Sequence, residues 1–271
     1  QILSSPMLRV ENLSKSFGGV AAMSDVTLDF PAGSLTAVIG PNGAGKTTFF
    51  NLISGAIRPD SGKVLLEGRD VAGLPATQVV GLGIGRAFQV AKLFTSLTVE
   101  QSLIGALQAQ RHQSGHLWRR FPLPDYRGSA HEVMELLGLH TQADVQSGNL
   151  SHGDQKLLDI ALALVLKPKV LLLDEPTAGM GPEERWKMID TVHRLWSLGG
   201  LTLIFIEHDM DIVFKIAQSI RVLCYGKVLA QGSPDEIRDH PAVIEAYLGV
   251  PAESVDEHGA GGSSAHAGGA H

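Results

Sequence analysis

Apolar and polar residues alternate in short runs over the first quarter of the chain. In Val26-Thr27-Leu28-Asp29-Phe30 every second side chain is apolar, which is the period of a half-buried strand. Gly, Pro and Asp residues, which are typical of turns, separate this run from its neighbours. We therefore predict strands at residues 8–13, 26–30, 35–39 and 63–66.

A helical period begins after Gly45, because the apolar residues then recur three and four positions apart at Phe49, Leu52, Ile53 and Ile57. A strand, a Gly-rich turn and a helix thus follow one another. The region from about residue 95 to 165 is also helical in pattern. It contains two spacings typical of a helix start, Thr98 to Gln101 and Ser129 to Glu132, and the second helix is predicted to end at Gly138.

Two apolar runs in the second half, 170–173 and 201–206, resemble strands that are buried on both faces of a parallel sheet. The helix between them is predicted to begin at Pro182 and to end at Gly199-Gly200. Its expected buried face carries Trp186, Ile189, Val192 and Trp196. A hairpin at 220–230 and a helix near 241–248 complete an α/β fold.

Composition excludes several classes of protein. No apolar run approaches the roughly 20 residues of a membrane-spanning helix, and no secretory signal is recognisable, so we expect a protein of the cytosol. The net charge of -6 and the absence of a basic tract argue against a nucleic-acid partner. Residues 250–271 are rich in Gly, Ala, Ser and His and are predicted to be a disordered tail without a metal site.

A glycine-rich segment between the predicted strand 35–39 and the following helix matches the phosphate-binding P-loop pattern. Its glycines let backbone N–H groups and the positive end of a helix face phosphate oxygens. Lysine adds a charge at the β and γ phosphates, and the threonine hydroxyl is placed to bind Mg²⁺. The alternative to a phosphate-binding loop is an ordinary Gly-rich turn. The predicted ATP contacts here are Gly40, Pro41, Asn42, Gly43, Ala44, Gly45, Lys46, Thr47 and Thr48.

Two carboxylates, Asp174 and Glu175, follow the buried strand 170–173. The ends of such strands are where α/β proteins place their ligands. Beside a P-loop, Asp174 is expected to hold Mg²⁺, directly or through water, and Glu175 to orient the attacking water. Without the P-loop, the same pair would indicate a solvated strand end.

The segment Leu150-Ser151-His152-Gly153-Asp154-Gln155 precedes that strand and resembles the LSGGQ signature of ABC transporter ATPases. Ser151 can cap a helix, with Asp154 completing a capping box, which leaves N–H groups for an anion. The resemblance implies that Ser151 and Gly153 contact the γ-phosphate of an ATP held by a second subunit in a head-to-tail dimer. His152 and Asp154 depart from the usual Gly and Gln.

Further matches to this family assign roles to single residues. Phe17 resembles the aromatic residue that stacks on adenine, with a core phenylalanine as the alternative. Gln89 resembles the glutamine that senses Mg²⁺ and the transport partner, and His208 resembles the histidine that contacts the γ-phosphate. Catalysis is thus expected of Glu175, His208, Lys46 and Gln89, and Mg²⁺ binding of Thr47, Gln89 and Asp174. Residues 178–181 occupy the position of the D-loop, with Gly181 where many members have Asp.

The resemblance implies a P-loop NTPase fold of the ABC ATPase type: a mixed central sheet, an antiparallel β-subdomain and an inserted helical subdomain. It places an extension at 1–7, the ATP-binding domain at 8–249, the helical subdomain at about 90–165 and the tail at 250–271. It also implies ATP and Mg²⁺, and a position at the cytoplasmic side of the inner membrane. The implied partners are permease subunits, a second ATPase subunit and, indirectly, a periplasmic solute-binding protein.

The similarity is greater to importers of branched-chain amino acids and their urea-importer relatives, through segments such as 86–89, 97–100, 206–210 and 246–249. Aliphatic amino acids are the first expected cargo, and urea or short amides the second. An exporter ATPase would share the catalytic motifs and differ near residues 89–97. A non-transport ABC protein would carry a second cassette or a nucleic-acid-binding region, and other P-loop GTPases or kinases would lack the signature.

Overall fold

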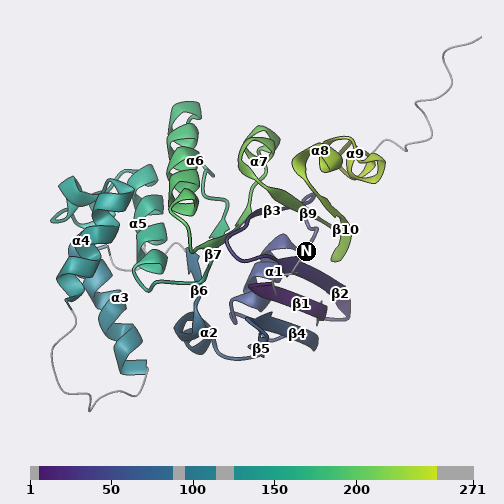
Figure 1. The fold of residues 1–271 in the computed structure, drawn as a ribbon, viewed down its shortest axis with the longest axis horizontal. Coiled ribbons are helices and arrows are strands. Elements are labelled where there is room, and N and C mark those ends of the chain that lie inside the picture. Colours follow the sequence, from purple (N-terminus) through teal and green to yellow (C-terminus); the bar gives the residue numbers. More distant parts are fainter. Residues whose placement is uncertain (1–5, 88–94, 114–124, 249–271) are drawn as a thin grey trace, which may run out of the picture.

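The computed structural model describes residues 6–87, 95–113 and 125–248. Its amino-terminal part is a four-stranded antiparallel sheet in the order β2-β1-β4-β5, formed by β1 (Leu8–Phe17), β2 (Val20–Phe30), β4 (Ser61–Leu66) and β5 (Arg69–Asp70) (Figure 1). The predicted strands lie where expected, but β1 and β2 are longer. Their pairing shifts register beyond Val10, so the alternation of apolar residues that marks a strand is lost there.

The central sheet has six strands in the order β10-β9-β3-β8-β7-β6. Adjacent strands are parallel except in the β9–β10 hairpin, which makes this a mixed sheet as predicted. The strands are β3 (Leu35–Ile39), β6 (Ile84–Ala87), β7 (Val170–Asp174), β8 (Thr202–Ile206), β9 (Ser219–Cys224) and β10 (Lys227–Gly232).

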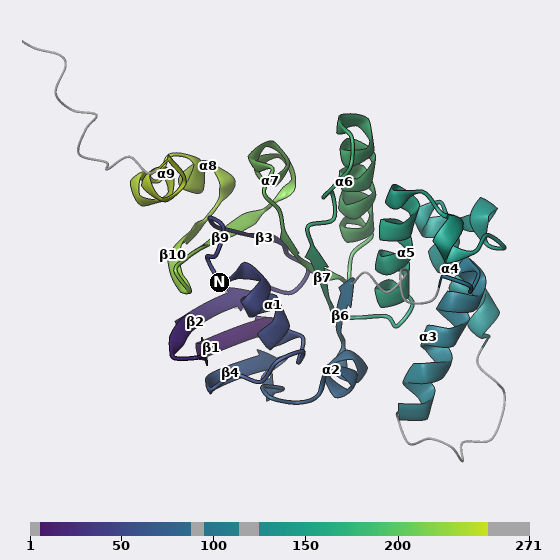
Figure 2. The same ribbon diagram turned by 180° about the vertical axis from the view of Figure 1, so that it is seen from behind.

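Both faces of the central sheet are buried, which explains the continuous apolar runs. Along β7, Leu171 and Leu173 belong to one hydrophobic cluster, and Val170 and Leu172 to another. The second cluster also contains apolar side chains of α1 (Lys46–Ile53), which packs between the two sheets (Figure 2). The first cluster is covered by α6 (Pro182–Ser197), α7 (Met210–Ile216), α8 (Pro234–Arg238) and α9 (Pro241–Leu248).

The buried face of helix α6 agrees with the predicted one at Ile189 and Val192 but not at the two tryptophans. Trp186 is 37% exposed and lies under the Lys215 ammonium, 4.1 Å from the ring centroid, while the Trp196 indole N–H donates to the Gly33 carbonyl at 2.7 Å. The two tryptophans therefore lie at the edges of the packed stripe, where their polar or cationic contacts remain available. The buried residues are Met188, Ile189, Val192 and Leu195.

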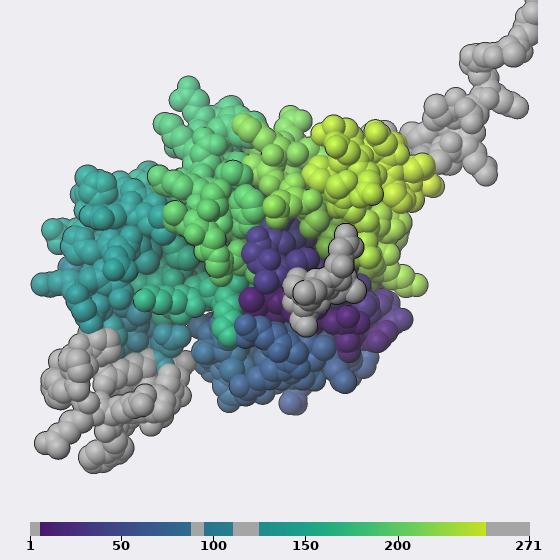
Figure 3. Space-filling model, in the orientation of Figure 1, coloured from purple at the N-terminus to yellow at the C-terminus, as the bar shows by residue number. Residues whose placement is uncertain are grey.

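A helical arm projects from the β6 and β7 side of the central sheet and forms the teal lobe at one side of the molecule in Figure 3. It contains α3 (Val99–Gln113), α4 (Tyr126–Leu137) and α5 (His152–Leu164), and short 3₁₀ turns connect α4 to α5; α2 (Ala76–Leu82) lies nearby, before β6. The helix start predicted at Thr98 is confirmed, and it is a capping box: the Gln101 N–H donates to Thr98 Oγ1 at 3.2 Å, and the Thr98 N–H donates to Gln101 Oε1 at 3.0 Å.

The predicted start of the next helix at Ser129 is wrong. Helix α4 begins at Tyr126 because Asp125 supplies a cap further upstream, where its Oδ1 accepts from the Gly128 N–H at 2.8 Å. The predicted end at Gly138 is confirmed, with a left-handed φ of 75°. Within the described residues, no helix is both long and apolar enough to cross a membrane.

Candidate nucleotide-binding site

The P-loop connects β3 to α1 and closes tightly against the β2 and β9 strands. Gly40 and Gly45 have φ values of 155° and 100°, and a Cβ at Gly40 would lie 2.1 Å from the Leu223 carbonyl oxygen. A Cβ at Gly45 would lie 2.8 Å from the Ala22 carbonyl oxygen. Only glycine fits both positions without a shift of the backbone. The loop is thereby fixed at the amino end of α1, where N–H groups attract anions.

The Lys46 side chain is held inside this loop. It is 6% exposed, and its Nζ donates to the carbonyl oxygens of Gly40 at 2.7 Å and Pro41 at 3.1 Å. Burial lowers the pKa of Lys46, and the negative charges of Glu175 and Asp174 partly oppose that shift. The ammonium therefore lies within electrostatic reach of both carboxylates that follow β7.

A cavity of about 500 Å³ brings together sequence motifs that lie far apart in the chain. Its lining combines the P-loop residues 42–48 with Glu175 and His208. The rest of the lining has no signal in the sequence and comes from Val20, Ala21, Ala22, Tyr225 and Gly226.

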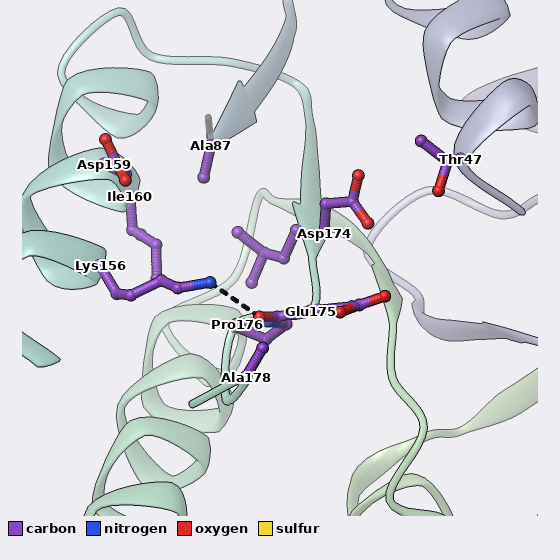
Figure 4. Close-up of a pocket in the computed structure, with 10 residues that line it drawn as sticks. Thr47, Ala87, Lys156, Asp159, Ile160, Asp174, Glu175, Pro176 and Ala178 are labelled. Carbon is purple, nitrogen blue, oxygen red and sulfur yellow. Dashed lines mark hydrogen bonds between the residues drawn. The ribbon is translucent and has the colours of Figure 1, made fainter. Parts of the chain in front are cut away.

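Glu175 and His208 form a hydrogen-bonded pair in this cavity, with 2.8 Å between Oε1 and Nε2. Glu175 has a φ of 49°, a left-handed conformation that is unfavourable for a residue with a side chain. Main-chain bonds hold it there: its N–H donates to Ile206 O at 3.0 Å, and its carbonyl accepts from the Ala178 N–H at 3.1 Å. The Lys156 Nζ, from α5, donates to the same carbonyl at 3.0 Å (Figure 4).

Asp174 is fixed by a buried arginine. The Arg86 guanidinium donates to Asp174 Oδ2 at 2.7 Å and to Asn51 Oδ1 at 2.7 Å, and its Cζ lies 5.6 Å from the Phe50 ring centroid. Only 5% of the Arg86 side chain is exposed. This contact neutralises part of the Asp174 charge and links β6 to both β7 and α1.

Thr47, from α1, and Asp174, at the end of β7, both line a second cavity of about 470 Å³ (Figure 4). These oxygen donors fit Mg²⁺, which takes few protein ligands and completes its shell with water and substrate phosphates. Among the described residues, no group of three or more His, Cys, Asp or Glu side chains is arranged to hold a metal ion. A bound Mg²⁺ would supply charge neutralisation at the phosphates. The third predicted ligand, Gln89, lies outside the described residues.

The signature segment starts α5, and Ser151 is its N-cap as predicted. Ser151 Oγ accepts from the Asp154 N–H at 3.1 Å, but the predicted capping box is incomplete. The Asp154 carboxylate accepts from the Ser151 hydroxyl at 2.7 Å and from the Gln142 amide at 3.0 Å, instead of from the Ser151 N–H. An aspartate is one methylene shorter than the glutamate of a full box, and the nearby Gln142 offers it a competing donor.

Neither Ser151 nor Gly153 is among the residues that line the two cavities. The signature instead contacts the loop after β7, through a hydrogen bond of 3.2 Å between His152 Nε2 and the Ala178 carbonyl. The role of Ser151 and Gly153 toward a second subunit's ATP remains a prediction.

Phe17 lies at the tip of the β1–β2 hairpin, and 49% of it is exposed, so the alternative of a core phenylalanine is wrong. It pairs with Val20, which lines the cavity, while the Lys15 ammonium lies 5.5 Å from its ring centroid. The ring is thus available beside the cavity but does not line it. Stacking on adenine remains a prediction.

Comparisons with known proteins identify the family. The ABC transporter model matches residues 23–178, and a branched-chain amino acid ATP-binding cassette transporter model matches residues 227–253. The high-affinity branched-chain amino acid transport ATP-binding protein LivG of Salmonella typhimurium is 39% identical over 254 residues, which cover 91% of this chain and 99% of LivG. The corresponding BraF protein of Pseudomonas aeruginosa is 37% identical over 254 residues, with coverages of 91% and 99%.

A solved structure agrees with this result. The ADP conformation of an ATP-binding cassette of an ABC transporter matches with a TM-score of 0.80 and 30% identity, over 91% of this chain and 100% of that chain. This chain therefore belongs to the ABC transporter ATP-binding family, whose members hydrolyse ATP as the nucleotide-binding subunits of transporters.

Proposed function

We propose that this chain powers the uptake of branched-chain and other hydrophobic amino acids through separate membrane subunits. The observation that carries the proposal is the match of residues 227–253 to the branched-chain amino acid transporter model. This region comprises β10, α8 and α9, which contribute none of the predicted catalytic residues. The match therefore concerns the kind of transporter and not merely ATP hydrolysis. The similarity to LivG and BraF, over almost their whole lengths, supports the same cargo.

In the proposed mechanism, the P-loop N–H groups and Lys46 hold the phosphates of ATP. Glu175 orients and polarises the attacking water, and His208 supports it through their mutual hydrogen bond. Positioning and electrostatics supply most of the catalysis of phosphoryl transfer, and these are the contributions that Glu175, His208 and the P-loop would make.

The proposal includes a head-to-tail pair of ATPase subunits, either two copies or two related chains. ATP binding closes the pair, with Ser151 and Gly153 of each chain facing the γ-phosphate of the other subunit's ATP. Product release reopens it. The movement passes to the permease through Gln89 and the helical arm, and a solute-binding protein delivers the cargo to the permease from the far side of the membrane.

Uptake by cells that lack this chain tests the cargo. Loss of radiolabelled leucine uptake, restored by the wild-type chain but not by Glu175→Gln, is the expected result, while urea uptake stays unchanged. Loss of urea uptake with intact leucine uptake would transfer the proposal to the urea or short-amide class. Co-purification from membranes with exporter components, instead of two importer permeases, would reject import altogether.

A further inference from the structure

Glu207 is a buried carboxylate beside the nucleotide site that the mechanism above does not use. It follows β8 directly and is 4% exposed, whereas the side chain of its neighbour His208 is 45% exposed. A buried carboxylate is destabilising unless hydrogen bonds compensate for its lost hydration. The partners of Glu207 therefore indicate what its position contributes.

Three hydrogen bonds from two loops converge on this carboxylate. Glu207 Oε1 accepts from the Thr177 N–H at 3.0 Å and from the Thr177 hydroxyl at 2.6 Å. Glu207 Oε2 accepts from the His208 N–H at 3.2 Å. Bonds to an ionised acceptor are shorter and stronger than those between neutral groups. Because Thr177 lies in the loop after β7, Glu207 fastens that loop to the one after β8.

The two loops that Glu207 joins carry the two members of the catalytic pair. Glu175 lies two residues before Thr177, and His208 is the residue after Glu207. Their side chains are 40% and 45% exposed, so packing against neighbours does little to fix them. The backbone bond from the Glu175 N–H to Ile206 O, at 3.0 Å, joins the loops where they begin, and the contacts of Glu207 to Thr177 join them further along. Together these bonds set the 2.8 Å distance between Glu175 and His208.

A second contact between the same two segments lies further from the pair. The Arg185 guanidinium, near the start of α6, is 2.7 Å from the carboxylate of Asp209, the N-cap of α7. Both of these side chains are partly exposed, so the contact is weaker than the buried one. Glu207 is thus the better-placed residue to hold the loops together.

We infer that Glu207 is a positioning residue for ATP hydrolysis. It keeps Glu175 and His208 at hydrogen-bonding distance by holding Thr177, and it does not itself line either cavity. A displacement of about 1 Å at such a site can cost about a hundredfold in rate. The inference concerns hydrolysis of ATP and not the cargo, so it stands or falls separately from the amino-acid proposal.

Substitutions of Glu207 and of Thr177 test the contact between the two loops from both sides. Glu207→Gln keeps the shape of the side chain but replaces one acceptor oxygen with a donor. Thr177→Val removes the hydroxyl, while Thr177→Ser keeps both donors. We expect Glu207→Gln and Thr177→Val to lower kcat about tenfold in the complex isolated from membranes, with Thr177→Ser close to wild type. KM and the Kd for a fluorescent ATP analogue should remain within about twofold of wild type, because the P-loop contacts are untouched.

Thr202→Val is the matched control. Thr202 is fully buried at the opposite end of β8, and its Oγ1 accepts from the Gly33 N–H at 2.9 Å, so this variant also loses a partly buried bond between a strand and a loop. Thermal unfolding gives the stability loss of each variant. We expect kcat to remain at the wild-type level in Thr202→Val. Hydrogen exchange in a peptide covering 175–181 should increase in Glu207→Gln and Thr177→Val but not in Thr177→Ser or Thr202→Val.

Two results would overturn the inference. The first is a fall in kcat no greater than that of Thr202→Val at a similar stability loss. The second is a fall in kcat that KM and Kd follow in parallel, because a purely structural role would impair binding as well. If Glu207→Gln does not fold, the comparison of Thr177→Val with Thr177→Ser tests the inference alone. Equal kcat values in these two variants would reject the positioning role of Glu207.

Discussion

The P-loop and the catalytic edge meet in one cavity but are built differently. The catalytic edge comprises residues 174–180 and residues 206–209, which lie at and after the ends of β7 and β8. The P-loop is one continuous segment whose shape depends on glycines that approach neighbouring strands closely. The catalytic edge comes from two loops and depends on bonds between distant residues, such as Lys156 to the Glu175 carbonyl and Glu207 to Thr177. The residues of the P-loop are therefore contiguous in the sequence, whereas only the fold brings the residues of the catalytic edge together.

The sharpest way to break the P-loop half is Gly40→Ala. Its Cβ would lie 2.1 Å from the Leu223 carbonyl, so the loop or β9 must move, and we expect a loss of about 3 kcal/mol or more in the free energy of unfolding. Gly43→Ala is the matched control, because nothing lies within 4 Å of its Cβ and only its φ of 77° is unfavourable. We expect it to lose about 1 kcal/mol. Equal losses in urea unfolding would contradict the close-approach argument.

Replacing Glu175 by Gln should slow ATP hydrolysis without weakening ATP binding. The amide keeps the shape of the side chain but cannot polarise water as a carboxylate does, and we expect kcat to fall at least about a hundredfold. Nucleotide affinity should persist, and the ATP-bound closed dimer should accumulate in size-exclusion chromatography.

Lys46→Ala provides the contrast on the P-loop side. It removes the buried ammonium that we propose holds the phosphates of ATP, so we expect weaker binding of a fluorescent ATP analogue by at least about tenfold. Stable ATP-dependent dimerisation of this variant alone would count against the proposed scheme, as would an unchanged kcat in Glu175→Gln.

This difference also explains what could be predicted from the sequence. The strand, glycine-rich turn and helix around Lys46 lie in one continuous stretch, and the apolar runs before Asp174 and Glu207 predict buried strands. The Arg86 to Asp174 bond joins residues 88 positions apart, and no local pattern marks it. The left-handed backbone of Glu175 has no sequence signal either, because glycine or asparagine would be expected there. Similarly, Ser129 and Glu132 match a helix start, yet Asp125 caps the helix first.

The variant Lys156→Met tests whether a side chain from α5 helps to hold the strained backbone of Glu175, and a smaller effect is expected. Methionine preserves most of the length of the side chain but cannot donate to the Glu175 carbonyl, and we expect kcat to fall about threefold to tenfold with unchanged nucleotide affinity. Lys169→Met is the control, since Lys169 forms an exposed ion pair with Glu67 near the start of β7. Its kcat should equal that of the wild type. A drop in both variants would indicate a general effect of lost charge.

The smallest expected effect is the difference in stability between a complete capping box, at α8, and an incomplete one, at α5. Ser233 and Glu236 form a full box at α8, with the Ser233 N–H donating to Glu236 Oε2 at 2.7 Å, whereas Ser151 and Asp154 lack the equivalent bond at α5. Removal of either serine hydroxyl leaves one helix N–H without its cap, and we expect Ser151→Ala and Ser233→Ala each to cost about 1 kcal/mol in urea unfolding. Asp154→Ala should cost less than Glu236→Ala, because only the glutamate satisfies a backbone N–H. Equal costs for the two acidic residues would show that the Asp154 contacts to Ser151 and Gln142 stabilise the start of α5 as well as a complete box does.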